Sequence, residues 1–180
     1  METLSFGQPL GAIMQVAYVV EDMDRALKHW TKTLGIGPFF LFEHFALLDA
    51  KYRGKPTDVD LTLALAFSGT MNFELIVQNN DVPSVYRETV DRRGYGFHHW
   101  AVSTRGFDAD VKRHEQAGAP LAFSGVAGVG ARAGYMDTMA SLGGMIELIE
   151  INDKVEEFFG MLHGAARGWD GTNPIRTLGA

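Results

Sequence analysis

The chain repeats one structural unit. The segment from His99, HWAVSTRGFDADVKRHEQAGAP, retraces the segment from Gln15, QVAYVVEDMDRALKHWTKTLGIGP: an apolar strand, a helix with acidic residues in its first turn, and a glycine turn. Both units close on the same tripeptide, ELI, at residues 74–76 and 147–149. A repeat constrains the fold strongly, because each copy needs a neighbour to bury its apolar face.

The repeat predicts an α+β protein of two tandem strand-helix-strand-strand-strand (βαβββ) modules. At 180 residues the chain is long enough for one ordinary domain. The predicted parts of this single domain, residues 1–180, are module one at about 12–78, a linker helix at about 79–95, module two at about 96–151, and a C-terminal helix and tail at 152–180. Within module one, strands are expected at 13–20, 39–48, 58–68 and 71–78, with a polar loop at 49–57.

Composition excludes several classes of function. A net charge of -6 argues against nucleic acid, whose phosphates require a basic surface. No apolar run approaches the roughly 20 residues that span a bilayer, and the first residues lack the pattern of a signal peptide. The chain has no cysteine, so thiolate metal sites and thiol nucleophiles are impossible. We therefore expect a cytoplasmic protein without a nucleic-acid or membrane partner.

One polar residue interrupts the apolar run in each of four predicted strands. These residues are Gln15 in IMQVAYV, Glu74 in NFELIV, His99 in FHHWAV and Glu147 in MIELIE. Burying two carboxylates on one surface is costly unless a cation is shared between them. One imidazole, two carboxylates and one amide oxygen form a ligand set for zinc, nickel, cobalt, manganese or iron(II).

Each of these residues also has an ordinary interpretation. Gln15 alone is typical of a hydrogen-bonded core amide, and His99 alone of a core histidine. Glu74 or Glu147 would face water if its sheet had a solvated side. Their equivalent positions in the two repeats favour a joint metal site. His98 is predicted to point to the opposite face from His99, because side chains alternate along a strand, and to be structural.

The sequence resembles the vicinal oxygen chelate superfamily, which includes glyoxalase I, methylmalonyl-CoA epimerase, extradiol dioxygenases and bleomycin-resistance proteins. The motifs that carry the resemblance are HWAV after Gly96, the two ELI strand ends and YMDTMASLGGMIELIE, within residues 12–151. The resemblance implies that the two modules form a curved, cup-shaped mixed sheet around one metal. It places the metal ligands at Gln15, Glu74, His99 and Glu147. Many members have histidine in place of Gln15, and some glyoxalases have glutamine.

The resemblance implies a metal-dependent isomerase, epimerase or lyase that removes a proton next to a carbonyl, with the metal stabilising the enolate. Glu147 and Glu74 are the candidate proton acceptors. Asp60 is a third candidate, because its placement resembles that of an extra acid in the epimerases, although an edge-strand role is the ordinary interpretation. Glu150 is predicted on the opposite face from Glu147. The loop before Glu147 resembles the epimerases more than the glyoxalases.

Two alternative functions remain open from the sequence. The first is an iron-dependent ring-cleaving dioxygenase, which Gln15 disfavours because only one histidine remains in the site. The second is a non-catalytic ligand-binding protein of the resistance type, which the full ligand set disfavours.

The predicted partner is a small-molecule carbonyl substrate. Arg53 and Arg132, on predicted loops, are candidates to bind a substrate carboxylate or phosphate, so glutathione, coenzyme A thioesters and aromatic or polycyclic metabolites all remain open. Candidate pocket residues are Phe39, Phe40, Phe42, Phe45, Trp100, Tyr135, Met136 and Met139.

We also predict a homodimer. Its candidate contact is an apolar stripe on the C-terminal helix, made of Val155, Phe158, Phe159 and Leu162. In the glycine-rich tail, Trp169 is expected to pack on the outer surface or at a dimer contact.

Overall fold

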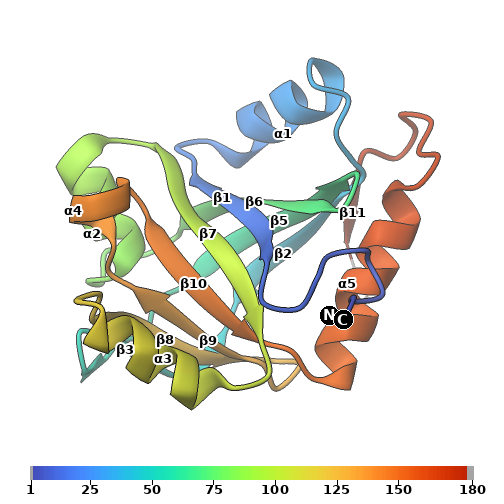
Figure 1. Ribbon diagram of the computed structural model, residues 1–180. Helices are drawn as coiled ribbons and strands as arrows, with labels where there is room; N and C mark the ends of the chain where they lie inside the picture. Colours follow the sequence, from blue (N-terminus) through green and yellow to red (C-terminus); the bar gives the residue numbers. More distant parts are fainter. Residues whose placement is uncertain (1, 178–180) are drawn as a thin grey trace.

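The first strands of the two repeats, β1 (Ile13–Val19) and β7 (Gly96–Thr104), lie antiparallel at the middle of one curved sheet (Figure 1). In the computed structural model, which describes residues 2–177, the strand order is β11-β2-β5-β6-β1-β7-β10-β9-β8-β3-β4. The last strand of each repeat pairs in parallel with the first, β6 (Met71–Gln78) with β1 and β10 (Met145–Glu150) with β7. The predicted α+β class with paired βαβββ modules is confirmed.

The outer strands complete the two halves of the sheet. On the side of β6 they are β5 (Leu61–Ser68), β2 (Phe39–Phe45) and β11 (Ile175–Thr177); on the side of β10 they are β9 (Arg132–Met136), β8 (Leu121–Ala127), β3 (Leu47–Tyr52) and β4 (Lys55–Pro56). Only Ala46 separates β2 from β3, yet β2 pairs with β5 and β3 pairs with β8. One bent stretch of chain therefore crosses from the outer edge of module one to the outer edge of module two.

This crossing corrects two expectations about module one. The predicted single strand at 39–48 is divided between β2 and β3, and the predicted loop at 49–57 contains most of the β3–β4 hairpin. The hairpin lies at the edge of the sheet, where lysine, proline and exposed polar residues are common. Its polar sequence is therefore compatible with a strand as well as a loop.

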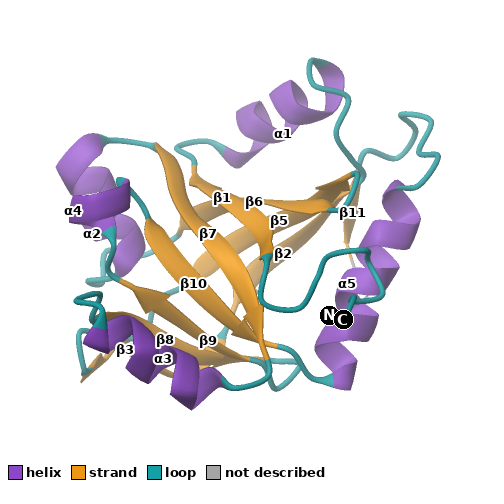
Figure 2. Ribbon diagram, in the orientation of Figure 1, coloured by secondary structure: helices purple, strands orange, loops and turns teal. Residues whose placement is uncertain are grey.

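The helices lie around the periphery of the sheet (Figure 2). They are α1 (Met23–Lys32), α2 (Val85–Arg93), α3 (Phe107–Gln116), α4 (Met139–Leu142) and α5 (Asp153–Ala166). Side-chain oxygens of Asp22, Ser84 and Asn152 cap the N-termini of α1, α2 and α5 by accepting from backbone N–H groups. Within residues 2–177, no helix is both long enough and apolar enough to cross a membrane.

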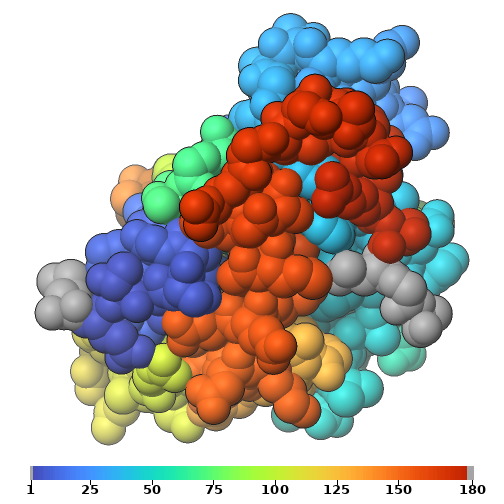
Figure 3. Space-filling view, turned by 90° about the vertical axis from the view of Figure 1, so that its right-hand side faces the viewer, coloured from blue at the N-terminus to red at the C-terminus, as the bar shows by residue number. Residues whose placement is uncertain are grey.

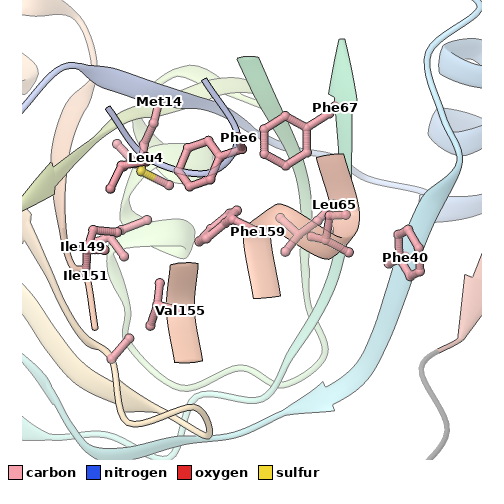
Figure 4. Packing of buried hydrophobic residues seen from close by; sticks show 13 residues of the cluster. Leu4, Phe6, Met14, Phe40, Leu65, Phe67, Ile149, Ile151, Val155 and Phe159 are labelled. Carbon is pink, nitrogen blue, oxygen red and sulfur yellow. The ribbon is translucent and has the colours of Figure 1, made fainter. Parts of the chain in front are cut away.

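Helix α5 packs its apolar stripe inside the molecule. Val155, Phe159 and Leu162 are buried in a cluster that also contains Phe6 and Phe67 (Figure 4). The outer side of α5 crosses one face of the molecule beside the N-terminal segment (Figure 3). Val155, Phe159 and Leu162 therefore satisfy their hydrophobicity within the chain, whereas Phe158 is half-buried. The dimer contact expected at this stripe stays a prediction.

The tail after α5 returns to the sheet. Strand β11 pairs in parallel with β2, and the Trp169 ring lies against Gly37, where a Cβ atom would come within 2.8 Å of the ring. The Trp169 Nε1–H donates to the carbonyl of Thr172 at 2.7 Å, so the indole helps to hold its own loop in place. Residues 178–180 of the predicted tail lie outside the described residues.

Candidate metal centre

Four neighbouring strands bring the predicted ligands together. Gln15 lies on β1, Glu74 on β6, His99 on β7 and Glu147 on β10, and these strands are consecutive in the sheet. All four side chains are buried, with exposed fractions between 0% and 7%. Two come from each module, so the centre lies across the pseudo-symmetric seam between the repeats.

The donor atoms of this group face one another. His99 Nε2 lies 3.1 Å from Glu147 Oε2 and 3.4 Å from Glu74 Oε2, and one ligand atom from each of these three residues lies within 4.8 Å of the other two. Among the described residues, Gln15 Oε1, Glu74 Oε2 and His99 Nε2 have no hydrogen-bond partner despite being buried. Unpaired buried polar atoms are costly, and a divalent cation between them satisfies all three. The residues present therefore fit a metal.

Electrostatics lead to the same conclusion. Burial, together with the neighbouring Glu147 carboxylate, raises the pKa of Glu74 well above its usual value of 4.5. Two ionised carboxylates repel each other in a site without water, and a bound cation offsets that repulsion.

His98 corrects the prediction that it points away from the site. In the pairing of β1 with β7, Ala17 is opposite His99 and the next residue, Tyr18, is opposite Phe97, so His98 is the extra residue of a β-bulge. A bulge breaks the alternation of side chains. The His98 and His99 rings consequently lie on the same side of β7, with their Nδ1 atoms 2.8 Å apart.

The contacts of His98 define which nitrogen of His99 is free. His98 Nε2 lies 3.3 Å from the carbonyl oxygen of Val85, which can only accept a hydrogen bond, so Nε2 carries the proton. Burial lowers the pKa of His98, as does its proximity to His99, which favours the neutral ring. Neutral His98 then accepts at Nδ1 from His99 Nδ1–H, and the lone pair of His99 Nε2 faces the two glutamates.

A cavity of about 210 Å³ opens beside the four candidate metal ligands. Gln15, Glu74 and Glu147 lie among its lining residues, and Tyr86 and Tyr135 add two hydroxyl groups that are 3.0 Å apart. The rest of the lining is apolar: Phe42, Phe45, Leu47, Leu61, Leu63, Leu65, Ala127, Gly128, Val129, Ala131, Ala133, Ile149, Val155, Phe158 and Phe159. Of the eight aromatic and methionine residues suggested by sequence for the pocket, the lining includes Phe42, Phe45 and Tyr135.

Asp60 lies apart from the four candidate metal ligands. Its carboxylate accepts from Asn79 Nδ2 at 3.1 Å and lies 2.9 Å from His44 Nδ1, and these contacts lower its pKa. Asp60 is partly exposed just before β5, outside the lining of the cavity.

Arg53 and Arg132 are engaged by carboxylates of the protein itself. Arg53 donates to Glu88 at 2.7 Å and Asp137 at 2.8 Å. Arg132 lies on β9 rather than on a loop, and it donates to Glu150 at 2.7 Å and Asp108 at 2.8 Å. The expectation that they meet a substrate anion is not supported, because neither lines the cavity and both charges are already compensated.

Comparison with known proteins identifies a family with this sequence pattern. A sequence profile of the Glyoxalase/Bleomycin resistance protein/Dioxygenase superfamily matches residues 14–136, which include three of the four candidate ligands and end before Glu147. A search of curated proteins gives no match.

Solved structures share the fold at low sequence identity. A hypothetical protein from Bacillus halodurans is 15% identical, with a TM-score of 0.59 over 79% of this chain and 95% of that one. Methylmalonyl-CoA epimerase from Mycobacterium tuberculosis is 19% identical, with a TM-score of 0.56 over 87% and 95%. The Streptomyces coelicolor epimerase in complex with 2-nitronate-propionyl-CoA is 18% identical, with a TM-score of 0.55 over 81% and 97%. At these identities the likeness shows a common fold.

Proposed function

The chain belongs to the glyoxalase/bleomycin resistance protein/dioxygenase superfamily, and on that premise we propose that it is a metal-dependent isomerase or lyase, of epimerase type, that moves a proton next to a carbonyl group. One observation carries the proposal: two buried carboxylates and an imidazole converge at the base of an apolar cavity, which is also lined by Gln15, whose buried amide oxygen has no hydrogen-bond partner. Epimerases of the same fold, one of them in complex with methylmalonyl-CoA, provide a precedent for this class of reaction.

The metal would be held by Gln15 Oε1, His99 Nε2 and the carboxylates of Glu74 and Glu147. When bound, a divalent ion supplies Lewis-acid polarisation of the substrate carbonyl, which makes the adjacent C–H group more acidic. We propose zinc, nickel, cobalt, manganese or iron as the ion, since the nitrogen and oxygen donors suit each of them.

The proton transfer would fall to the two glutamates. Both line the cavity, so either carboxylate can approach the α-carbon of a bound carbonyl compound. The apolar walls exclude water, which keeps the abstracted proton available for return to the substrate.

The two alternative functions have weaker support. A ring-cleaving dioxygenase of the two-histidine, one-carboxylate type lacks its second histidine, because Gln15 occupies that place. A purely ligand-binding protein has no need for buried donor atoms without hydrogen-bond partners.

Substitution of Glu147 tests the proposal. Metal content is first measured in protein purified without chelators, and α-proton exchange is followed by NMR in D₂O with a panel of carbonyl compounds. Glu147→Gln keeps the shape and removes the charge and basicity, so metal affinity is expected to fall about 10- to 100-fold. With metal in excess, exchange is expected to fall by about 10² to 10⁴.

Glu150→Gln is the matched control in the same strand. Glu150 is paired with Arg132 outside the cavity lining, so its loss is expected to leave metal affinity and exchange close to wild type. If Glu150→Gln abolishes exchange while Glu147→Gln is silent, the proposed site is wrong.

A further inference from the structure

The cavity carries charge only at its base. Glu74 and Glu147 are its charged lining residues, and within residues 2–177 neither a lysine nor an arginine lines it. The two arginines suggested by sequence as anion-binding groups are held by Glu88, Asp137, Glu150 and Asp108. A substrate anion inside this cavity would therefore find no counter-charge from the protein.

A bound divalent metal would not supply the missing positive charge. Two carboxylates carry two negative charges, which offset the two positive charges of a divalent ion, so the loaded centre is close to neutral. Placing a carboxylate or phosphate against apolar walls beside a neutral centre is unfavourable, because the anion loses its hydration without gaining an ion pair.

We propose that the substrate is an uncharged carbonyl compound with a ring-shaped apolar body. This inference rests on the proposed function, since it names the substrate class of the same site. An apolar cavity of roughly 150 Å³ holds one benzene molecule, so about 210 Å³ accommodates a substituted ring or two small fused rings.

The aromatic wall supports a ring rather than a chain. The Phe158 and Phe42 ring centroids lie 5.8 Å apart at an angle of 57°, and both residues line the cavity. Such tilted aromatic pairs provide flat surfaces and exposed ring edges against which a third ring packs well. Phe158 belongs to α5, outside both repeats, so a segment added to the two-module fold forms the wall.

Two tyrosines supply the polar contact that orients such a ligand. The hydroxyl groups of Tyr86 and Tyr135 are 3.0 Å apart, and one hydrogen bond between them uses only one of their two protons. Both phenols are buried, and both line the cavity beside the glutamates. The second O–H proton is therefore available to an oxygen atom of the substrate.

A matched pair of probes tests the charge requirement. 4′-Methylacetophenone and 4-acetylbenzoate share a ring and an acetyl group and differ in whether a methyl or a carboxylate stands opposite. Binding is measured by isothermal titration calorimetry with metal-free and metal-loaded protein. The neutral ketone is expected to bind at least about ten-fold more tightly in both forms, because only the anion loses its hydration without compensation. Equal or tighter binding of 4-acetylbenzoate, or no binding of either compound at millimolar concentration, would overturn the inference.

Three variants on α5 locate the bound ring. Phe158→Ala removes one aromatic wall and is expected to weaken binding of the neutral ketone about ten-fold. Glu157→Ala, an exposed neighbour on the same helix, is expected to leave binding unchanged. Phe158→Leu retains an apolar wall and is expected to recover part of the affinity, which separates loss of the wall from loss of folding. Identical affinities in all three variants would place the ligand elsewhere and contradict the proposal.

Proton exchange distinguishes failure of this inference from failure of the proposed function. Exchange of the acetyl protons of 4′-methylacetophenone in D₂O, abolished by Glu147→Gln, supports both. Tight binding of the ketone without exchange of any carbonyl compound supports the substrate class and defeats the proposed reaction. Exchange with the anionic thioester methylmalonyl-CoA but not with neutral ketones supports the reaction and defeats the substrate class.

Discussion

At the scale of single residues, the candidate metal centre is supported by a histidine outside the predicted ligand set. The β-bulge at His98 turns its ring toward His99, and the two Nδ1 atoms meet at 2.8 Å. His98 also stacks on Tyr86, with ring centroids 4.9 Å apart, so its orientation is fixed from two sides. Hydrogen-bond partners of this kind orient a ligating histidine and select its tautomer.

Replacing His98 is expected to weaken metal binding without removing a ligand. His98→Phe fills the space but leaves His99 Nδ1 without its partner, so the metal dissociation constant is expected to rise about 10- to 100-fold. Chelator competition measures this constant, and the ¹⁵N shifts of the His99 ring report its tautomer. His29→Phe, on the exposed side of α1, is the control. Unchanged metal affinity and unchanged His99 shifts in His98→Phe would refute the positioning role.

The sequence identified the four converging residues but missed the fifth. Gln15, Glu74, His99 and Glu147 stand out because each interrupts an apolar strand, and this signal is independent of exact geometry. His98 was assigned to the opposite face because alternation assumes a regular strand. The position of a bulge depends on how two distant strands pair, which no local pattern of residues records.

At the scale of elements, the crossing from β2 to β3 links the two modules at their outer edges. An ion-pair cluster fixes the hairpin that follows: Arg53, just after β3, bonds Glu88 on α2 and Asp137 after β9. Tyr52 also donates to Glu88 at 2.8 Å. The cluster thus connects the hairpin, the linker helix and module two at one point.

This cluster predicts a pH-dependent contribution to stability. Burial acts to raise the pKa values of Glu88 and Asp137, but hydrogen bonds from Arg53 prevail and hold both below their ordinary values of 4.5 and 3.8. Groups with lowered folded-state pKa values stabilise the protein above their unfolded pKa, and this contribution is lost as the pH falls through the folded values. It is therefore present at pH 7 and fades below about pH 4.5.

Arg53→Met is expected to lower the free energy of unfolding at pH 7 by about 1 kcal/mol, a modest figure because the Arg53 side chain is 39% exposed and partly screened. The difference from wild type is expected to shrink below about pH 4 as the two carboxylates become protonated. Urea unfolding at pH 7, 5 and 3.5 measures it. Arg25→Met removes a far more exposed ion pair and is the control at each pH. A difference that grows toward acid would contradict the sign of the effect.

Elements were predicted well where periodicity was strong and poorly at the sheet edge. β1 and β6 follow clear apolar patterns, and the structure places them within one or two residues of the expectation. The β3–β4 hairpin carries a polar sequence because it is an exposed edge, and the same composition is typical of loops. Its pairing with β8 is set by the tertiary fold.

At the scale of the whole molecule, the surfaces that suggested a homodimer are occupied within the chain. The short strands β11 and β4 stand at the two edges of the sheet, and three of the four residues of the α5 stripe are buried. Short edge strands limit pairing between sheets. The homodimer stays a prediction. Sedimentation analysis at micromolar concentration tests it, and a monomeric mass would refute it.

The candidate metal centre joins residues of both modules, because each contributes two of the four candidate ligands. The two modules meet at the antiparallel pairing of β1 with β7, the strands that hold Gln15 and His99. A ligand that binds only the folded state stabilises everything that must fold to form its site. Metal binding is therefore expected to stabilise the whole chain rather than one half.

Calorimetry of protein with and without metal tests this coupling. A metal concentration of about 100 times the dissociation constant adds about 2.7 kcal/mol to the free energy of unfolding. For a chain of 180 residues, each kcal/mol raises the Tm by about 2–4 °C, so we expect one cooperative transition that moves up by about 5–10 °C. Gln15→Ala, which alters only module one, is expected to reduce the shift of that single transition. Two transitions, of which only one responds to metal, would show that the modules fold independently and that the centre lies within one of them.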